Sequence, residues 1–309
     1  MIPALVLTAG LATRLRPLSH VRAKAALPVA GRPLVHRIIS RLEAAGVRDL
    51  VLNLHHLPHT ITRVVGDGAH LGVRVRYSWE SPVLGSAGGP RRALPLLDAP
   101  RFLVVNGDTL TDVAVEAVVR DHERSGALVT MAVVPNADPD KYGGVLVDEG
   151  GVVTGFTRRG SPPPSYHFIG VQVAQADAFA GVPDEARRDS VGALYPELMR
   201  DRPGSIRAHI SRAAFLDIGT PADYLDTCVR LAAREGQPLP RGTVLWDDVV
   251  VEPGARLQDC VVTDGVRVPA RADWSGVTVR IAGDHLEPFE RREEGLAIGP
   301  IARGTGRAR

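Results

Sequence analysis

Residues 5–29 read LVLTAGLATRLRPLSHVRAKAALPV, an apolar run followed at once by a basic loop. The run predicts a buried strand, and Gly10 with its small neighbours lets backbone N–H groups approach an anion closely. Four cations and no carboxylate follow, at Arg14, Arg16, Arg22 and Lys24. A solvated basic loop would account for them, but the carboxyl end of a parallel strand is also where α/β proteins bind ligands. The stretch therefore predicts a polyanion site, and we expect a triphosphate.

The whole chain is nearly neutral, so this cation cluster is local. Its 309 residues include 37 Lys and Arg against 35 Asp and Glu, and 44% are apolar. A general nucleic-acid binder is more often basic throughout. The two cysteines have no metal or redox spacing, and the apolar N-terminus is too short to span a bilayer. We expect a soluble, cytoplasmic protein without a nucleic-acid or membrane partner.

Strand-like and helix-like segments alternate through the first half of the chain. The predicted strands are residues 4–8, 49–54, 73–79, 102–106 and 128–134, and the predicted helices are residues 33–45, 60–65, 86–97 and 113–125. This alternation predicts an α/β fold, a Rossmann-like and mostly parallel sheet with helices on both faces. Later segments predict short antiparallel strands over 143–173, a strand at 206–210, and helices at 190–199 and 221–234.

The C-terminal part has a different period. Apolar residues recur every six positions in two registers, Leu245, Val251 and Leu257 in one and Val249, Ala255 and Val261 in the other. This spacing is typical of β-helix coils. We predict a short hexapeptide-type, left-handed β-helix stub over residues 239–288 and a disordered tail over 289–309, which is polar and aperiodic.

The basic loop resembles the signature of the sugar-1-phosphate nucleotidylyltransferases, G-x-G-T-R-L…P-K…L-P-V. The matching residues are Gly10-Leu-Ala-Thr13-Arg14-Leu15, Lys24 and Leu27-Pro28-Val29, and the resemblance covers most of residues 3–235. It implies a catalytic domain over 1–238 that joins a nucleoside triphosphate to a sugar 1-phosphate and releases pyrophosphate. It favours GTP with mannose 1-phosphate or heptose 1-phosphate. Ala12 and Ala23 depart from the glycine and proline of the pattern.

The resemblance also implies roles at matched positions. Catalysis would fall to Arg14, Lys24 and Asp108, with both cations on substrate phosphates. Asp108 and Asp217 would bind Mg²⁺, the implied cofactor, which takes one or two carboxylates plus phosphates. From the residues alone, Gly107-Asp108 fits a turn cap as well, and the segment after Glu80 fits a simple glycine-rich loop. The implied nucleotide contacts are Leu7, Ala9, Gly10, Thr13, Arg14, Glu80, Gly85, Ser86 and Asp108.

The sugar-phosphate side departs most from the family pattern. The resemblance places Gly143, Arg158, Arg159 and His167 there, but Phe-x-Glu-Lys-Pro of the family is Phe156-Thr157-Arg158-Arg159-Gly160 in this chain. Arg159 can replace the phosphate-binding lysine. Arg158 cannot replace the glutamate, because arginine has no acceptor for sugar hydroxyls. The change suggests an altered sugar, such as one with an additional anionic group, or weak or absent catalysis.

Three alternatives stay open on the sequence. The chain could be a uridylyl- or thymidylyltransferase for another sugar 1-phosphate. It could be a non-catalytic nucleotide-sugar-binding regulatory homologue, which the departures at Ala12, Ala23 and Arg158 prompt. A hexapeptide-repeat acyltransferase is the third, although the repeat region is short for one. A homo-oligomer is a further expectation, because β-helix stubs often mediate self-association.

Overall fold

A computed structural model describes residues 2–162 and 164–302. These residues fall into two compact units. Unit 1 consists of Met1–Gly10 and Val35–Leu216, and unit 2 of Leu11–Leu34 and Asp217–Arg309. The loop that carries the signature, Leu11–Leu34, is called the signature loop below. It belongs to the same unit as the C-terminal part of the chain. A division of the chain at residue 238 would place these two segments in different domains.

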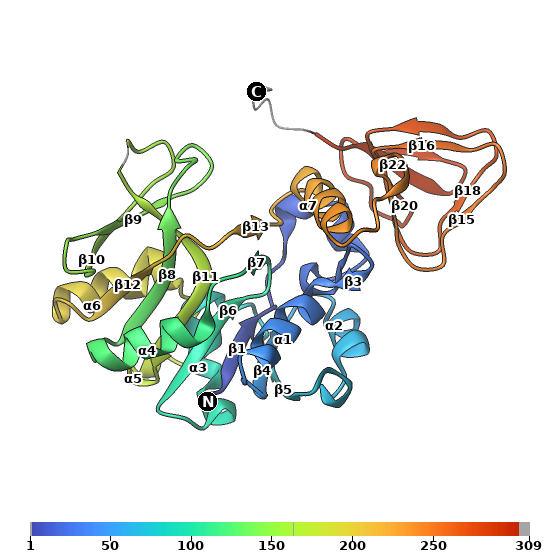
Figure 1. Ribbon diagram of the computed structural model, residues 1–309. Coiled ribbons are helices and arrows are strands. Elements are labelled where there is room, and N and C mark those ends of the chain that lie inside the picture. Colours follow the sequence, from blue (N-terminus) through green and yellow to red (C-terminus); the bar gives the residue numbers. More distant parts are fainter. Residues whose placement is uncertain (1, 163, 303–309) are drawn as a thin grey trace. The chain divides into compact units, whose positions relative to one another are not determined.

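Unit 1 is built on a nine-stranded sheet with a parallel centre (Figure 1). The parallel strands are, in spatial order, β6 (Arg101–Asn106), β1 (Ala4–Leu7), β4 (Asp49–Leu54) and β5 (Arg74–Trp79). These strands are apolar because both faces of the sheet are covered. Leu5 packs into a core with α3, α5 and α6, while its neighbours Ala4 and Val6 point to the other face and are also fully buried.

The other half of the sheet is mixed. Its strands are β8 (Val129–Pro135), β9 (Gly144–Val147), β10 (Val153–Thr157), β11 (Tyr166–Gln175) and β12 (Ile206–Ile210). β11 pairs antiparallel with β6, β8 and β9, and β9 pairs antiparallel with β10, whereas β12 runs parallel to β8. A small separate ladder joins β7 (Thr109–Thr111) to β13 (Phe215–Asp217), of which Phe215 and Leu216 belong to unit 1. The predicted α/β class and the antiparallel strands after residue 143 are confirmed.

The helices lie close to their predicted positions. They are α1 (Leu34–Ala44), α2 (Pro58–Val65), α3 (Gly85–Leu97), α4 (Val115–Ser125), α5 (Asp177–Ala180) and α6 (Tyr195–Asp201) in the first part of the chain, and α7 (Pro221–Arg234). A π-helical turn, Ser190–Leu194, precedes α6 where one helix over 190–199 was predicted. Thr220 caps α7 by accepting a hydrogen bond from the Asp223 N–H, and Pro221 occupies its first turn. No helix among the described residues is long and apolar enough to cross a bilayer.

Unit 2 contains a short parallel β-helix after α7. Its strands stack in three parallel sets, β14 (Val244–Leu245) with β17 (Val261–Val262) and β20 (Val277–Ile281), β15 (Val250–Val251) with β18 (Arg267–Val268), and β16 (Arg256–Gln258) with β19 (Asp273–Ser275). Its core includes Val262, Val268 and Val279, all fully buried. The stub is confirmed, and its left-handedness stays a prediction.

The disordered tail predicted from residue 289 is wrong for most of its length. β21 (Arg291–Glu293) and β22 (Leu296–Pro300) form an antiparallel ladder on β20. Ala297 and Ile298 are buried against the last coil, because β20 offers an open edge to which this short apolar strand pairs. Residues 303–309 lie outside the described residues.

The signature loop folds as short turns rather than long elements. It contains three 3₁₀ turns, Thr13–Leu15, Leu18–His20 and Lys24–Ala26, and a hairpin of β2 (Pro28–Val29) and β3 (Arg32–Pro33). Single 3₁₀ turns have strained hydrogen bonds and hold their shape poorly alone. The loop is steadied by α7, because the Tyr224 hydroxyl donates a hydrogen bond to the Pro28 carbonyl.

Candidate functional site

The carboxyl ends of β1 and β6 meet closely in unit 1. The N–H groups of Thr8 and Ala9 both donate to Asn53 Oδ1, at 2.6 and 3.3 Å. A Cβ at Gly107 would lie 2.5 Å from the Leu7 carbonyl oxygen, so only glycine permits this approach. Asp108 follows Gly107 at this edge. The structure thus brings together the predicted residues Leu7, Ala9 and Asp108.

Glu80 supports this edge from the interior of the protein. It is only 4% exposed, and its two carboxylate oxygens accept hydrogen bonds from Asn53 Nδ2 and the Leu84 N–H, both at 2.7 Å. A Cβ at Gly89 would lie 2.8 Å from Glu80 Oε1, so α3 can pack here only with glycine. Glu80 thus supports this edge of the sheet, and its contact with a nucleotide stays a prediction.

Asn53 is a site residue that sequence reasoning missed. It lies at the carboxyl side of β4, is 3% exposed, and connects the backbone after β1 to Glu80. The available signal was an amide side chain near the end of a buried parallel strand, next in the sheet to the strand that leads into the signature loop.

The first turn of α3 is tied to the segment before α6. Gly85 has φ +79°, and a Cβ there would lie 2.7 Å from the Arg188 carbonyl oxygen. The Ala87 N–H donates to that oxygen at 2.9 Å, and the Ser190 N–H donates to Ser86 Oγ at 2.8 Å. Gly85 is thus required for the turn, and the Ser86 hydroxyl already has a partner within the protein.

In unit 2, the side chains of Arg14 and Asp217 converge at Gly219. A Cβ placed on Gly219 would lie 3.5 Å from Asp217 Oδ2, 3.8 Å from Arg14 Nη1 and 3.2 Å from Asp223 Oδ2. Asp223 is held by the helix cap, because Thr220 Oγ1 donates to its carboxylate at 2.8 Å. The residue predicted to bind a triphosphate and one residue predicted to bind Mg²⁺ therefore lie at the same point of this unit.

The two departures in the signature loop have backbone conformations close to those that glycine and proline favour. Ala12 has φ 48° and ψ 42°, the left-handed conformation that glycine adopts readily and alanine at a cost of about 1 kcal/mol. Ala23 has φ −57°, near the value that proline imposes. Thr13 and Lys24 begin the turns that follow these two residues.

The predicted sugar side lies in unit 1 beside β9 and β10. Gly143 and Gly144 pass close to Thr157, and a Cβ at Gly144 would lie 2.5 Å from Thr157 Oγ1. Arg158 and Arg159 follow β10 directly and are exposed. The closely packed glycines and the adjacent pair of cations occupy one end of this hairpin.

His167 lies in an aromatic cluster at the same end of unit 1. Its ring centroid is 4.1 Å from that of Tyr142 and 4.9 Å from that of Phe215. The pKa of His167 is lowered to about 4, mainly by burial; a hydrogen bond with the Gly143 backbone opposes the shift, and the charge of Lys141 adds to it. The imidazole is uncharged at pH 7, so it can exchange hydrogen bonds with hydroxyl groups but adds no positive charge.

The predicted metal ligands are divided between the units, with Asp108 in unit 1 and Asp217 in unit 2. In the parts of the chain that the structure describes, no group of three or more His, Cys, Asp and Glu side chains could hold a metal. The prediction needs only two carboxylates, because substrate phosphates and water fill the remaining positions around Mg²⁺.

Comparison with known proteins adds a family and several relatives. Residues 3–234 match the family described as nucleotidyl transferase. The chain is 29% identical over 293 residues to mannose-1-phosphate guanylyltransferase of Mycobacterium tuberculosis, covering 87% of this chain and 82% of the relative. It is 34% identical over 223 residues to N-acetylmuramate α-1-phosphate uridylyltransferase of Neisseria meningitidis, covering 70% and 93%.

A solved structure shares the fold. HddC from Yersinia pseudotuberculosis, in a complex with GMP-PN, superposes with a TM-score of 0.66 at 23% identity. The match covers 75% of this chain and 100% of that chain.

Proposed function

This chain belongs to the nucleotidyl transferase family and transfers a nucleotidyl group from a nucleoside triphosphate to a sugar 1-phosphate, and we propose that GTP and mannose 1-phosphate or heptose 1-phosphate are its substrates. The similarity to the guanylyltransferase of M. tuberculosis supports this choice, because it covers 87% of the chain. We also propose that residues 1–238 form the catalytic domain and that the protein acts in the cytoplasm.

The convergence of Arg14 and Asp217 at Gly219 is the observation that carries the proposed mechanism. The nucleophile is a sugar-phosphate oxygen, which is already ionised and needs no strong base. It attacks the α-phosphorus in line, and pyrophosphate leaves. Catalysis is then positioning and charge neutralisation. Arg14 offers its fork of donors to the triphosphate, and Lys24 contributes a mobile charge on the substrate phosphates.

Asp108 and Asp217 are the proposed holders of Mg²⁺. Both offer hard carboxylate oxygens, the donors that this ion prefers, and Asp217 lies where Arg14 would bring phosphate. When bound, Mg²⁺ would neutralise phosphate charge and act as a template. In unit 1, Leu7, Ala9 and Gly10 would offer backbone groups to the nucleotide, and Asn53 and Glu80 keep that backbone in place.

A second candidate is uridylyl transfer to a sugar 1-phosphate that carries a carboxylate. Arg158 and Arg159 favour it, because they are adjacent, exposed cations after β10, beside the glycine pair at Gly143. The 34% identity to the N-acetylmuramate α-1-phosphate enzyme of N. meningitidis points the same way, since muramate has a carboxylate that mannose lacks.

A grid of substrates distinguishes the two candidates. Pyrophosphate release would be measured with Mg²⁺ for GTP, UTP, dTTP, CTP and ATP, each against mannose, heptose, glucose, N-acetylglucosamine and N-acetylmuramate 1-phosphates. Turnover with GTP and mannose or heptose 1-phosphate supports the first candidate, and turnover with UTP and the muramate supports the second. If every pair fails while the nucleotides still bind by calorimetry, the chain is a regulatory homologue.

A further inference from the structure

The signature loop is fixed to the β-helix stub at Arg22. Its Nε and Nη2 atoms donate to the two carboxylate oxygens of Asp264 at 2.7 and 2.6 Å, and Nη2 also donates to Asp247 at 2.6 Å. The guanidinium lies 5.4 Å from the centre of the Trp246 ring. The Arg22 side chain is only 12% exposed, so its charge depends on these partners.

The two aspartates form a preformed acceptor for Arg22. They lie at equivalent turns of successive coils, and the Asp247 N–H donates to Asp264 Oδ1 at 3.2 Å. The Gly265 N–H donates to the Asp247 carbonyl oxygen at 3.0 Å. The coil backbone therefore orients both carboxylates toward one guanidinium, in the two-pronged geometry that suits arginine.

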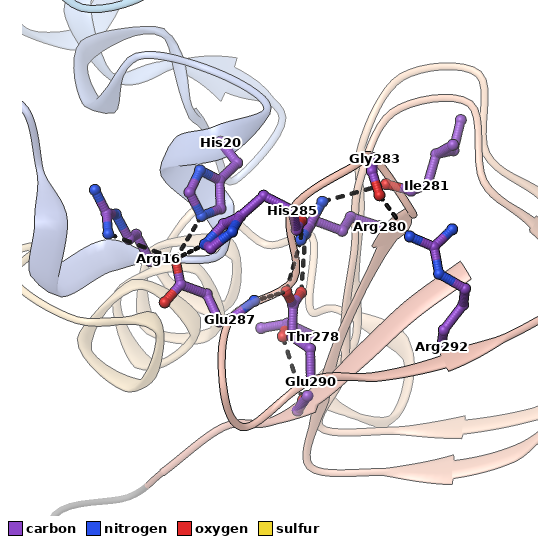
Figure 2. A network of polar contacts seen from close by, with 11 residues as sticks. Arg16, His20, Thr278, Arg280, Ile281, Gly283, His285, Glu287, Glu290 and Arg292 are labelled. Carbon is purple, nitrogen blue, oxygen red and sulfur yellow. Dashed lines mark hydrogen bonds and ion pairs between the residues drawn. The ribbon is translucent and has the colours of Figure 1, made fainter. Parts of the chain in front are cut away.

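A second anchor holds the loop at Glu287 (Figure 2). The Glu287 Oε1 atom lies 2.6 Å from His20 Nε2, 3.6 Å from Arg16 Nη1 and 4.0 Å from His285 Nε2. Hydrogen bonding to His20 lowers the pKa of Glu287, and the charges of His20, Arg16 and His285 lower it further, against a smaller effect of burial. Glu287 is therefore the common partner of two residues of the signature loop.

A buried ion pair between Arg280 and Glu290 holds the segment that carries Glu287. Arg280 and Glu290, with side chains 6% and 0% exposed, are joined by hydrogen bonds of 2.8 and 2.6 Å (Figure 2). The same Glu290 carboxylate accepts the Glu287 N–H at 2.8 Å, and Arg280 donates to the His285 carbonyl at 2.9 Å. The segment between β20 and β21 is thus shaped internally before it meets the loop.

We propose that the β-helix stub is a clamp that holds the signature loop in its catalytic conformation, with Arg22 as the main positioning residue. This inference rests on the proposed function of Arg14 and Lys24. The anchored residues Arg16 to Arg22 are the segment between those two cations, and its single 3₁₀ turns are poorly able to hold it alone. Two anchors, one on successive coils and one in the segment between β20 and β21, would fix the spacing of the two cations.

The test is the double change Asp247→Asn with Asp264→Asn, which removes the charge that holds Arg22 and keeps the side-chain shape. We expect kcat/KM for the nucleoside triphosphate to fall about tenfold to a hundredfold, since small misplacements of catalytic groups have effects of this size. We expect amide hydrogen exchange to accelerate in residues 12–26. We also expect the melting temperature to fall by more than about 3 °C, because the poorly exposed Arg22 charge loses both anionic partners, so turnover and exchange are compared at a temperature where both proteins are folded. The matched control is Glu293→Gln, an exposed carboxylate of the stub that pairs with Arg291.

Wild-type turnover together with wild-type exchange in the double variant would overturn the clamp. So would a loss of activity that only follows the loss of folded protein. If the double variant does not fold, Arg22→Lys replaces it, since lysine keeps the charge but lacks the fork of donors. The same loss of kcat/KM and faster exchange in residues 12–26 are expected, and wild-type values of both would overturn the clamp. If the wild-type chain turns over no substrate pair, the proposed function fails, while exchange and nucleotide affinity by calorimetry still test the clamp.

Discussion

Trp246 of the β-helix stub donates its indole N–H to the hydroxyl of Tyr224 in α7 at 2.8 Å. Tyr224 is fully buried, and its own hydroxyl donates a second hydrogen bond, to the Pro28 carbonyl in the signature loop. Coil, helix and loop are therefore joined by one short chain of hydrogen bonds inside unit 2.

Tyr224→Phe should lower the free energy of unfolding by about 1–3 kcal/mol, because it leaves the Trp246 N–H and the Pro28 carbonyl buried without this partner. Urea denaturation measures the change. Tyr77→Phe is the control, since the Tyr77 hydroxyl bonds to the Gly66 carbonyl at an exposed position and its loss should cost less. Equal effects of the two changes would contradict the importance of the buried chain.

Arg14→Ala should reduce kcat by about a hundredfold or more, because it removes a charge aimed at the triphosphate while the fold stays intact. Steady-state pyrophosphate release measures the loss, and circular dichroism checks the fold. Arg267→Ala removes an exposed arginine of the stub that pairs with Glu252, and should leave turnover unchanged. Full activity of the Arg14 variant would refute the role given to the signature loop.

Glu80→Ala should cost about 3 kcal/mol of stability, since Asn53 Nδ2 and the Leu84 N–H would both lose a charged acceptor in the interior. Urea denaturation again gives the value. Glu123→Ala, which removes an exposed partner of Arg101, should cost less than about 1 kcal/mol. A stable Glu80 variant with a raised KM for the nucleotide would instead support the predicted contact of Glu80 with the ligand.

Stability should fall as the pH is lowered from about 6.5 toward 4, in part because of His122. The pKa of this side chain is lowered to about 4, mainly by burial and in part by the charge of Arg101, while Glu123 opposes the shift. Below pH 6.5 the unfolded chain binds a proton at this position and the folded chain does not. The free energy of unfolding therefore falls by about 2 kcal/mol between pH 7.5 and pH 5, and this residue causes no change above pH 7.5.

The measurement is urea denaturation at pH 7.5 and pH 5 for the wild type and His122→Gln. His122 lies 2.9 Å from Thr130 Oγ1 and 3.0 Å from Gln175 Nε2, contacts that a glutamine can partly replace. The pH-dependent loss should be smaller in the variant by about 2 kcal/mol. An identical loss in both proteins would show that His122 does not carry it.

The sequence predicts the parallel centre of the sheet well, because strands such as Ala4–Leu7 are covered on both faces and show as continuous apolar runs. It fails for Leu296–Pro300, because that strand exists only through its pairing with β20. Ala12 was recognised as a departure, but its left-handed backbone could not be read from one letter.

The candidate site shows the same division. Arg14, Lys24 and Asp108 follow from local spacing and the resemblance that it carries. The burial of Glu80 and its bond to Asn53 do not, since an isolated carboxylate usually lies at the surface. The pairing of Arg22 with Asp264 joins residues 242 positions apart, so no local sequence pattern predicts it.

The ladder of β22 on β20 has a consequence for how this chain can be handled. β22 pairs antiparallel with Val277–Ile281 of β20 and so covers the edge of the last coil. Without it, the backbone groups of that edge could pair with a strand from another molecule. A chain shortened to residue 288, where the polar tail was predicted to begin, would lose that cover and the buried Ala297 and Ile298. Removing these residues to make the protein more soluble would instead expose the unpaired edge of β20 and promote aggregation.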